Sequence, residues 1–368
     1  MLHIDVLPAR HGDSLWIEYG DAAAPTRILV DGGPAFAYAG LRERIAALAP
    51  EDRYLDLLVV THIDGDHIEG IIRLLRDEAL GLKVREIWFN GLRQIRSVTP
   101  PTAPLAGVPY SVLQGEYLGA LIKERGIKWN TAFGGGAIMA GARVQLPGGA
   151  SAFLLSPTRT ELLLLHKEWN TELEKAGIEP DASEEVMARL RAIERLAPPH
   201  SFVGPGSPDI DALAARPFEQ DNAIANGSSI AMLLEYAGVR LLLLGDAFPD
   251  VVEQGISALL REEGGTRLRV DLVKLPHHGS RANVSPSLLD KLACERYVVS
   301  SDGKYFRHPD AEAIARVIRH GAGSVHLLFN YRTALTSPWD DEQLKMDHAY
   351  RTTYPAPGGS GLALRLAD

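Results

Sequence analysis

Short runs of apolar or alternating residues, each closed by glycine, proline or aspartate, recur along the first half of the chain. Such runs are typical of β-strands, because successive strand side chains point to opposite faces. They predict strands at 2–7, 14–20, 26–33, 55–60 and 84–90. Apolar residues three and four positions apart predict helices at 41–50, 67–77 and 117–127.

The second half repeats this alternation of strands and helices. Two strands are expected within 142–157, then a hairpin at 228–246 that turns at Ala237-Gly238, a strand that ends at two adjacent histidines, and strands at 295–302 and 324–330. A proline-rich stretch, 97–110, is expected to form a loop or flap, and 200–227 a long irregular connection.

Both halves begin with strands and continue with alternating strands and helices. This order predicts an α/β protein in which two mixed β-sheets pack face to face with helices outside, an αββα sandwich. We expect a single domain over 1–368 with a helical insertion at about 158–220, and we find no repeat of fixed period.

Composition narrows the choice of function. The content of 46% hydrophobic and 23% charged residues fits a globular protein, and the net charge of −9 argues against a broad nucleic-acid-binding surface. Cys294 is the only cysteine, so no internal disulfide can form. The sequence shows neither a signal peptide nor eighteen consecutive apolar residues, and we expect a cytoplasmic protein without membrane contact.

The strongest chemical signal lies between the predicted strand 55–60 and helix 67–77. There His62, Asp64, Asp66 and His67 supply two imidazoles and two carboxylates within six residues. These nitrogen and oxygen donors suit zinc or manganese, and iron as well. The spacing lets His62 and Asp64 bind one ion and Asp66 and His67 a second. The alternative is a solvated turn in which Asp66 caps the helix.

Two later strands end in side chains of the same kind. Asp246 closes the run RLLLLGD, and His277, His278 and Ser280 follow the run DLVKLP. Polar side chains at the ends of several strands point to a shared site, because loops at strand ends are where chemistry collects.

In this order the three signals resemble those of the metallo-β-lactamase superfamily. More narrowly, the loop sequence HIDGDH resembles the branch that contains the C-terminal domain of the competence protein ComEC, and it is similar to that of phosphorylcholine esterases. The resemblance covers most of the chain outside about 158–220. It implies the αββα metallo-β-lactamase fold and a centre of two divalent ions.

The resemblance also implies roles for individual residues. His62 and Asp64 match ligands of the first metal, Asp66 and His67 ligands of the second, and Asp246 the carboxylate that bridges both. One of His277 and His278 matches the strand-terminal ligand. We favour His277 as this ligand and His278 as a catalytic contact to phosphate or leaving group, with the reverse assignment kept open.

The chain departs from the family pattern at a third histidine ligand, where it reads DNAIANGSS; Asn226 or Asp221 could take that place. His308 is expected near the substrate as a catalytic residue, with a surface-loop histidine as the alternative, and Asp66 is expected to be catalytic as well as a ligand. Ser280 and Asn226 are expected to contact the substrate. Asp13 is expected either to orient a ligand histidine near the substrate or to cap a turn. An anion beside the metals could be contacted by Lys304, Tyr305 and Arg307.

The predicted activity is metal-dependent hydrolysis by a metal-bridging hydroxide. The oxygen-rich ligand set and the resemblance favour a phosphodiesterase of nuclease type, and the acidic charge favours a small phosphodiester or a nucleic-acid end as substrate. Asp246 stands where a lactam-hydrolysing subgroup of the superfamily has cysteine, which argues against β-lactams as substrates. The alternatives are hydrolysis of a carboxylic ester, lactone or thioester, and a non-catalytic interaction module whose helical insertion binds a protein partner. Oligomeric state and native metal are not indicated by the sequence.

Overall fold

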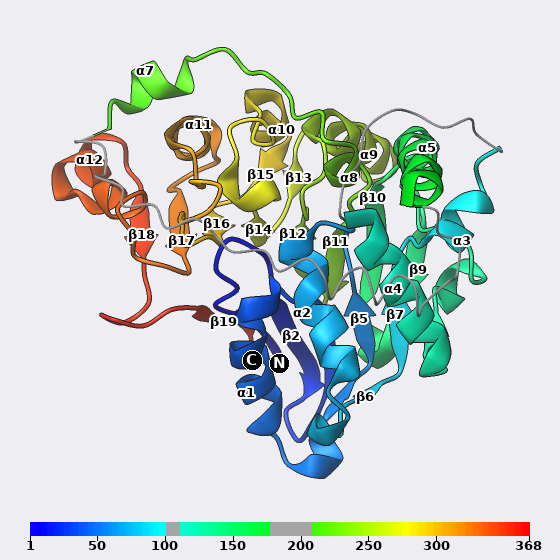
Figure 1. Cartoon of the computed structure of the whole chain (residues 1–368). Coiled ribbons are helices and arrows are strands. Elements are labelled where there is room, and N and C mark those ends of the chain that lie inside the picture. Colours follow the sequence, from blue (N-terminus) through cyan, green and yellow to red (C-terminus); the bar gives the residue numbers. More distant parts are fainter. Residues whose placement is uncertain (101–110, 177–207) are drawn as a thin grey trace.

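The computed structural model describes residues 1–100, 111–176 and 208–368. Two β-sheets lie face to face at its centre, with helices on both outer sides (Figure 1). The predicted αββα sandwich is therefore confirmed. None of the helices in these ranges is both long and apolar enough to cross a bilayer.

The first sheet has seven strands in the order β19-β1-β2-β3-β5-β7-β8. Their bounds are Leu362–Ala367, Leu2–Val6, Leu15–Asp21, Ala24–Val30, Leu57–Val59, Glu86–Trp88 and Lys128–Trp129. Strands β19, β1, β2 and β3 are antiparallel neighbours, whereas β3, β5, β7 and β8 run parallel. The carboxyl ends of β3 and β5 therefore lie side by side.

The second sheet has eight strands in the order β18-β17-β16-β14-β12-β11-β10-β9. Their bounds are Arg351–Thr353, His326–Phe329, Arg296–Val299, Leu272–Lys274, Val239–Leu243, Ala231–Tyr236, Ser151–Ser156 and Arg143–Gln145. The first five strands are parallel neighbours and the last three pair antiparallel. This arrangement mirrors that of the first sheet.

Alternating strand residues account for the four layers. Leu57 and Val59 of β5 face the second sheet, where they pack against Leu241 and Leu243 of β12 in one core cluster. Leu58, between the first two, belongs to an outer cluster with helices α1 (Tyr38–Ala46), α2 (Gly65–Arg76), α4 (Ser111–Glu124) and α5 (Arg159–Ala176). A third cluster joins the other sheet to α9 (Pro249–Glu263), α10 (Pro286–Asp290) and α11 (Ala311–His320).

Helix α2 shows most clearly why local sequence specifies its element. Ile68, Ile71, Leu74 and Leu75 recur at helical spacing and are all buried against the first sheet. The hairpin of β11 and β12 turns at Ala237 and Gly238, as predicted, and both residues have positive φ. A two-residue turn of this kind matches the right-handed twist of the strands it joins.

Other predictions were incomplete. The supposedly irregular stretch 208–227 contains two short helices, α7 (Ile210–Ala214) and α8 (Ile224–Gly227). The expected insertion begins with α5, but its second predicted helix and most of the proline-rich flap fall outside the described residues. The C-terminal strands β18 and β19 were not predicted.

Candidate metal centre

The HIDGDH segment runs from the loop after β5 into the first turn of α2. Asp64 occupies the N-cap position of α2, yet its side chain makes no capping hydrogen bond. Asp66 lies in the first helical turn and is buried. The helix thus begins without side-chain capping by either aspartate, which removes the main support for a purely structural role of this loop.

Four side chains form a first group around one oxygen of Asp246. His62 Nε2 lies 3.6 Å from Asp64 Oδ2 and 3.7 Å from Asp246 Oδ2. His277 Nε2 also lies 3.7 Å from Asp246 Oδ2. We call these residues the first cluster: His62, Asp64, Asp246 and His277.

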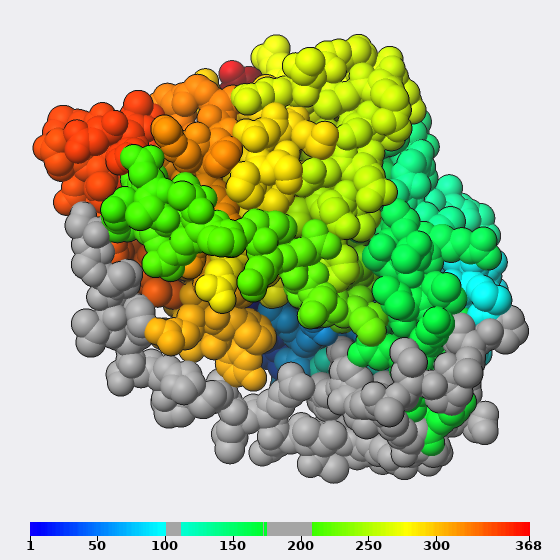
Figure 2. Space-filling model, turned by 90° about the horizontal axis from the view of Figure 1, so that it is seen from above, coloured from blue at the N-terminus to red at the C-terminus, as the bar shows by residue number. Residues whose placement is uncertain are grey.

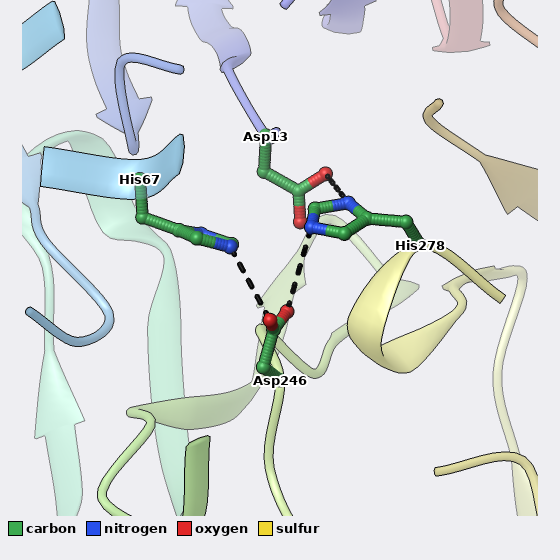
Figure 3. Close-up of side chains that lie close together, drawn as sticks. All are labelled: Asp13, His67, Asp246 and His278. Carbon is green, nitrogen blue, oxygen red and sulfur yellow. Dashed lines mark ion pairs between the residues drawn. The ribbon is translucent and has the colours of Figure 1, made fainter. Parts of the chain in front are cut away.

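A second group shares Asp246 with the first. His278 Nε2 lies 3.4 Å from Asp66 Oδ2 and 3.9 Å from Asp246 Oδ1. His67 Nε2 lies 3.4 Å from Asp246 Oδ2 and 3.8 Å from Asp66 Oδ2. We call these residues the second cluster: Asp66, His67, Asp246 and His278. Figure 3 shows His67 and His278 turned toward Asp246 from opposite sides.

The donor atoms of both clusters fit divalent metal ions. The Nε2 atoms of His62, His67 and His278 are buried and have no hydrogen-bond partner, and the same holds for Asp246 Oδ1. Each buried polar atom without a hydrogen-bond partner lowers the stability of the folded protein by about 1–3 kcal/mol. Two atoms that each lie 2.0–2.2 Å from a tetrahedral ion are about 3.4 Å apart. The observed separations, too long for hydrogen bonds, are close to this value.

In three of the four histidines the other ring nitrogen, Nδ1, lies within hydrogen-bond distance of a neighbouring side chain. His67 Nδ1 lies 2.8 Å from Asp31 Oδ2, and His62 Nδ1 lies 3.0 Å from the hydroxyls of both Thr61 and Ser229. Asn283 Oδ1 lies 2.9 Å from Nδ1 of His277. Contacts of this kind fix ring orientation in metal sites and leave Nε2 free to bind the ion.

Asp13 lies beside His278 rather than joining the clusters. Its Oδ1 lies 3.2 Å from His278 Nδ1 (Figure 3). The same oxygen also accepts a hydrogen bond from Ser300, while Oδ2 accepts one of 2.6 Å from the ammonium of Lys274. Both oxygens are thus occupied, although Asp13, His67, Asp246 and His278 lie close enough together to suggest a four-ligand site. Because Nδ1 of His278 forms no hydrogen bond with this carboxylate, the orienting role of Asp13 stays a prediction.

Electrostatics place positive charge at the centre of the site. Burial alone would lower the pKa of His277, but the carboxylates of Asp246 and Asp221 outweigh it and raise the pKa to about 9. Burial would raise the pKa of Asp246, yet the surrounding imidazoles hold it well below its usual range. The carboxylates therefore stabilise positive charge here, whether protons or metal ions carry it.

The paired histidines occupy an unfavourable backbone conformation. His277 has φ 46° and His278 has φ 54°, both in the left-handed region that costs a residue with a Cβ atom about 1–2 kcal/mol. The amide of His277 donates to the carbonyl of Gly245, which ties this turn to the end of β12. Strain of this kind concentrates at functional sites, and here it lets two adjacent imidazoles serve two different clusters.

The remaining predicted residues lie around the clusters. The Asn226 amide donates a hydrogen bond of 2.7 Å to Asp221 and lies 3.4 Å from His277 Nδ1. Asn226 and Asp221 therefore lie on the Nδ1 side of the His277 ring. The amide of Ser280 donates to the carbonyl of His277, and its hydroxyl accepts from Ala282, inside the turn. His308 lies with its ring centroid 5.0 Å from that of His277.

Several supporting residues were not identified from the sequence: Asp31, Thr61, Ser229, Lys274 and Asn283. Asp31 alone had a local signal, since it closes a predicted strand in LVDGG. The others are isolated polar residues whose role depends on distant partners.

Sequence comparisons found no matching protein-family model and no matching curated protein. Solved structures with similar architecture include YhfI from Bacillus subtilis, described as a metallo-β-lactamase fold protein, with 10% identity, coverage of 99% of this chain and 98% of that one, and a TM-score of 0.40. Zinc-bound PqqB from Methylobacterium extorquens matches at 12% identity, full coverage of both chains and a TM-score of 0.41.

A third structure is CmlA, described as a diiron β-hydroxylase from Streptomyces venezuelae. It matches at 12% identity and a TM-score of 0.40 over 98% of this chain, which spans 54% of the length of CmlA. Similarity of this degree concerns architecture only. The fold assignment rests on the chain's own layers: it is an α/β protein with two facing mixed sheets, helices on both outer faces and a buried candidate metal site at one edge.

Proposed function

We propose that this chain is a metal-dependent hydrolase of the metallo-β-lactamase type that holds two divalent ions and cleaves phosphodiesters. The observation that carries the proposal is the convergence of three buried, unpartnered imidazole nitrogens on Asp246. An interaction module would have no need of such a centre. Oxygen-rich ligands without thiolates are compatible with zinc, manganese or iron.

Two ions fit the ligand set better than one. Asp246 belongs to both clusters, and the other three members of each cluster are different residues. Both His277 and His278 then act as ligands, so His277 takes the place for which the sequence offered only Asn226 or Asp221. Ions at such positions lower the pKa of water and stabilise negative charge on a substrate oxygen.

The residues beside the clusters suit an anionic substrate. The Asp64 side chain is about one-third exposed and opens the first cluster to solvent. Burial lowers the pKa of His308, so its imidazole is neutral at pH 7 and can donate one hydrogen bond to a leaving group. Its Nδ1 lies 3.4 Å from Asp310 Oδ2.

Metal analysis combined with activity measurements tests the proposal. Protein stripped with a chelator is reloaded with zinc or manganese and assayed on bis(p-nitrophenyl) phosphate and on p-nitrophenyl acetate. We expect about two ions per chain and cleavage of the diester. Asp66→Asn should abolish this cleavage, whereas Glu51→Gln, an isosteric change at an exposed carboxylate, should not.

Other results would favour the alternatives. Bound metal with turnover of the acetate only would indicate an ester, lactone or thioester hydrolase. Neither metal nor turnover would indicate an interaction module. The partner-binding role predicted for the insertion and the narrower likeness to the ComEC branch both stay predictions.

A further inference from the structure

An exposed group of aromatic rings adjoins the proposed metal centre. Of the five large hydrophobic side chains that are exposed in the described residues, three gather here: Phe36 (56% exposed), Tyr305 (36%) and Phe306 (45%). All three surround the ring of His11, with centroid distances of 5.5, 4.7 and 5.3 Å. We call these four residues the aromatic patch.

Three segments that are far apart in the sequence bring the patch together. His11 lies between β1 and β2, Phe36 follows β3, and Tyr305 and Phe306 follow β16. Backbone contacts fix their arrangement, since the amide of Asp302 donates to the carbonyl of Arg10 and the amide of Arg10 donates to the hydroxyl of Tyr331. The fold therefore brings these four residues together into one group, which distinguishes them from exposed hydrophobic residues that occur singly on a surface.

The patch is continuous with the first cluster. The ring of Phe306 stacks on that of His308 with centroids 6.3 Å apart, and His308 in turn lies 5.0 Å from His277. On the other side, Gly12 packs so closely that an added Cβ would lie 1.8 Å from the carbonyl oxygen of Asp66. A substrate held at the metals would therefore have its neighbouring groups beside these rings.

The surface of the described residues is hollowed on the face seen in Figure 2. In Figure 2 a hollow opens between orange atoms of the region near residue 300 and green atoms, with blue atoms of the N-terminal part at its base. The exposed aromatic rings of the patch can contact a ligand without rearrangement of the core.

Nearby charge distinguishes between two kinds of ligand for aromatic rings. Planar bases stack on such rings, and quaternary ammonium groups bind over their faces. Exposed Arg10 and Lys304 flank the patch in the same loops; Arg10 forms an ion pair of 3.7 Å with Asp302, and Lys304 adds further positive charge. This charge opposes a cationic ligand and favours a planar ring that carries phosphate.

We propose that the aromatic patch binds a nucleobase, so that the substrate of the metal centre is a nucleoside phosphodiester. Phe306 and Phe36 would stack on the base while the phosphodiester reaches the clusters past His308. This inference rests on the proposed function and specifies its substrate class. It assigns specificity to residues that touch no metal.

Two diesters with the same leaving group test the inference on the full chain with its metals. They are the p-nitrophenyl ester of thymidine 5′-monophosphate and methyl p-nitrophenyl phosphate. Stacking on one aromatic ring corresponds to roughly 5- to 150-fold in affinity. Phe306→Leu keeps apolar volume but removes the aromatic face. It should lower the ratio of the two kcat/KM values by at least fivefold, mainly through KM, and Phe36→Leu should act in the same direction.

Met346→Leu is the matched control, since Met346 is an exposed apolar residue of α12 (Glu342–Asp347) and no part of the patch. An unchanged ratio in both phenylalanine variants would overturn the inference. So would selective loss of activity toward p-nitrophenyl phosphorylcholine, which would identify a cation site. A lowered melting temperature with an unchanged ratio would show instead that the rings are covered by the protein itself.

Binding separates this inference from the proposed function. If the metal-loaded protein cleaves neither diester, the proposed function fails. Saturation-transfer NMR with thymidine 5′-monophosphate then tests whether the aromatic patch binds a nucleotide, independently of any cleavage. If the saturation-transfer signal of the nucleotide is lost with Phe306→Leu and kept with Met346→Leu, the inference is supported. If both variants give the same signal, the inference is contradicted.

Discussion

Replacement of Asp246 by asparagine is the most informative single change, because both clusters depend on its carboxylate. Its Oδ2 lies 3.7 Å from Nε2 of His62 and 3.4 Å from Nε2 of His67, which belong to different clusters. Asparagine has nearly the same shape, so the contacts of the Asp246 backbone with Ser229 and Asn283 are kept. The change thus removes charge and not volume.

The expected loss can be bounded from these contacts. Removal of a residue that merely supports a ligand lowers metal affinity about 10- to 100-fold. A direct ligand should cost at least the upper end of this range, about 2.7 kcal/mol for each ion. In the proposed two-ion centre Asp246 binds both ions, so the two sites should weaken together, by about ten thousandfold in the product of their affinities.

Competition between the protein and a chromophoric chelator measures this effect. Titrations with zinc at pH 7.5 would be compared for wild type, Asp246→Asn, Asp64→Asn and Asp66→Asn, with circular dichroism to confirm folding. Asp64→Asn should weaken one ion and Asp66→Asn the other. The reasoning is refuted if Asp246→Asn weakens only one site, or if either of the other variants weakens both equally.

Three further predictions follow from the surroundings of the clusters. Because His277 has a pKa of about 9, it carries a proton in the metal-free protein at pH 7. Metal binding should therefore release protons, and metal affinity should increase as the pH rises from 7 to 9. Calorimetry in buffers of different ionisation enthalpy measures the number of protons released, and a value of zero would contradict this prediction. Lys274→Met leaves the buried carboxylate of Asp13 unpaired and should cost about 3–5 kcal/mol in urea unfolding; a loss below 1 kcal/mol would mean that the ion pair matters little. Gly12→Ala should weaken metal binding without altering a ligand, because its Cβ would meet the carbonyl of Asp66, and unchanged affinity with unchanged stability would show that the loop adapts.

Parts of the structure governed by nearby residues were predictable. The apolar spacing of α2, the hairpin at Ala237 and the HIDGDH loop are local patterns, and their elements lie where the sequence placed them. The association of the loop with Asp246 was implied by the resemblance alone, and the Asp246 carboxylate lies 3.7 Å from Nε2 of His62 and 3.4 Å from Nε2 of His67.

Features that depend on distant pairing were not predictable. Strand β19 pairs with β1 across almost the entire chain, and nothing in its short sequence specifies that partner. The division of His277 and His278 between two clusters depends on the left-handed backbone at both residues. The role of Lys274 likewise appears only when Asp13 is seen beside it, 261 positions away.

The ligand sets have a mechanical consequence, since each cluster takes residues from both halves of the chain. His62, Asp64, Asp66 and His67 belong to the half that builds most of the first sheet, and Asp246, His277 and His278 to the half that builds the second. An ion bound there acts as a reversible cross-link, and the two sheets cannot separate without releasing it. At a thousand times its dissociation constant, such an ion adds about 4.1 kcal/mol to the free energy of unfolding. The free energy of unfolding of this protein should therefore increase with the concentration of free divalent metal ions around it.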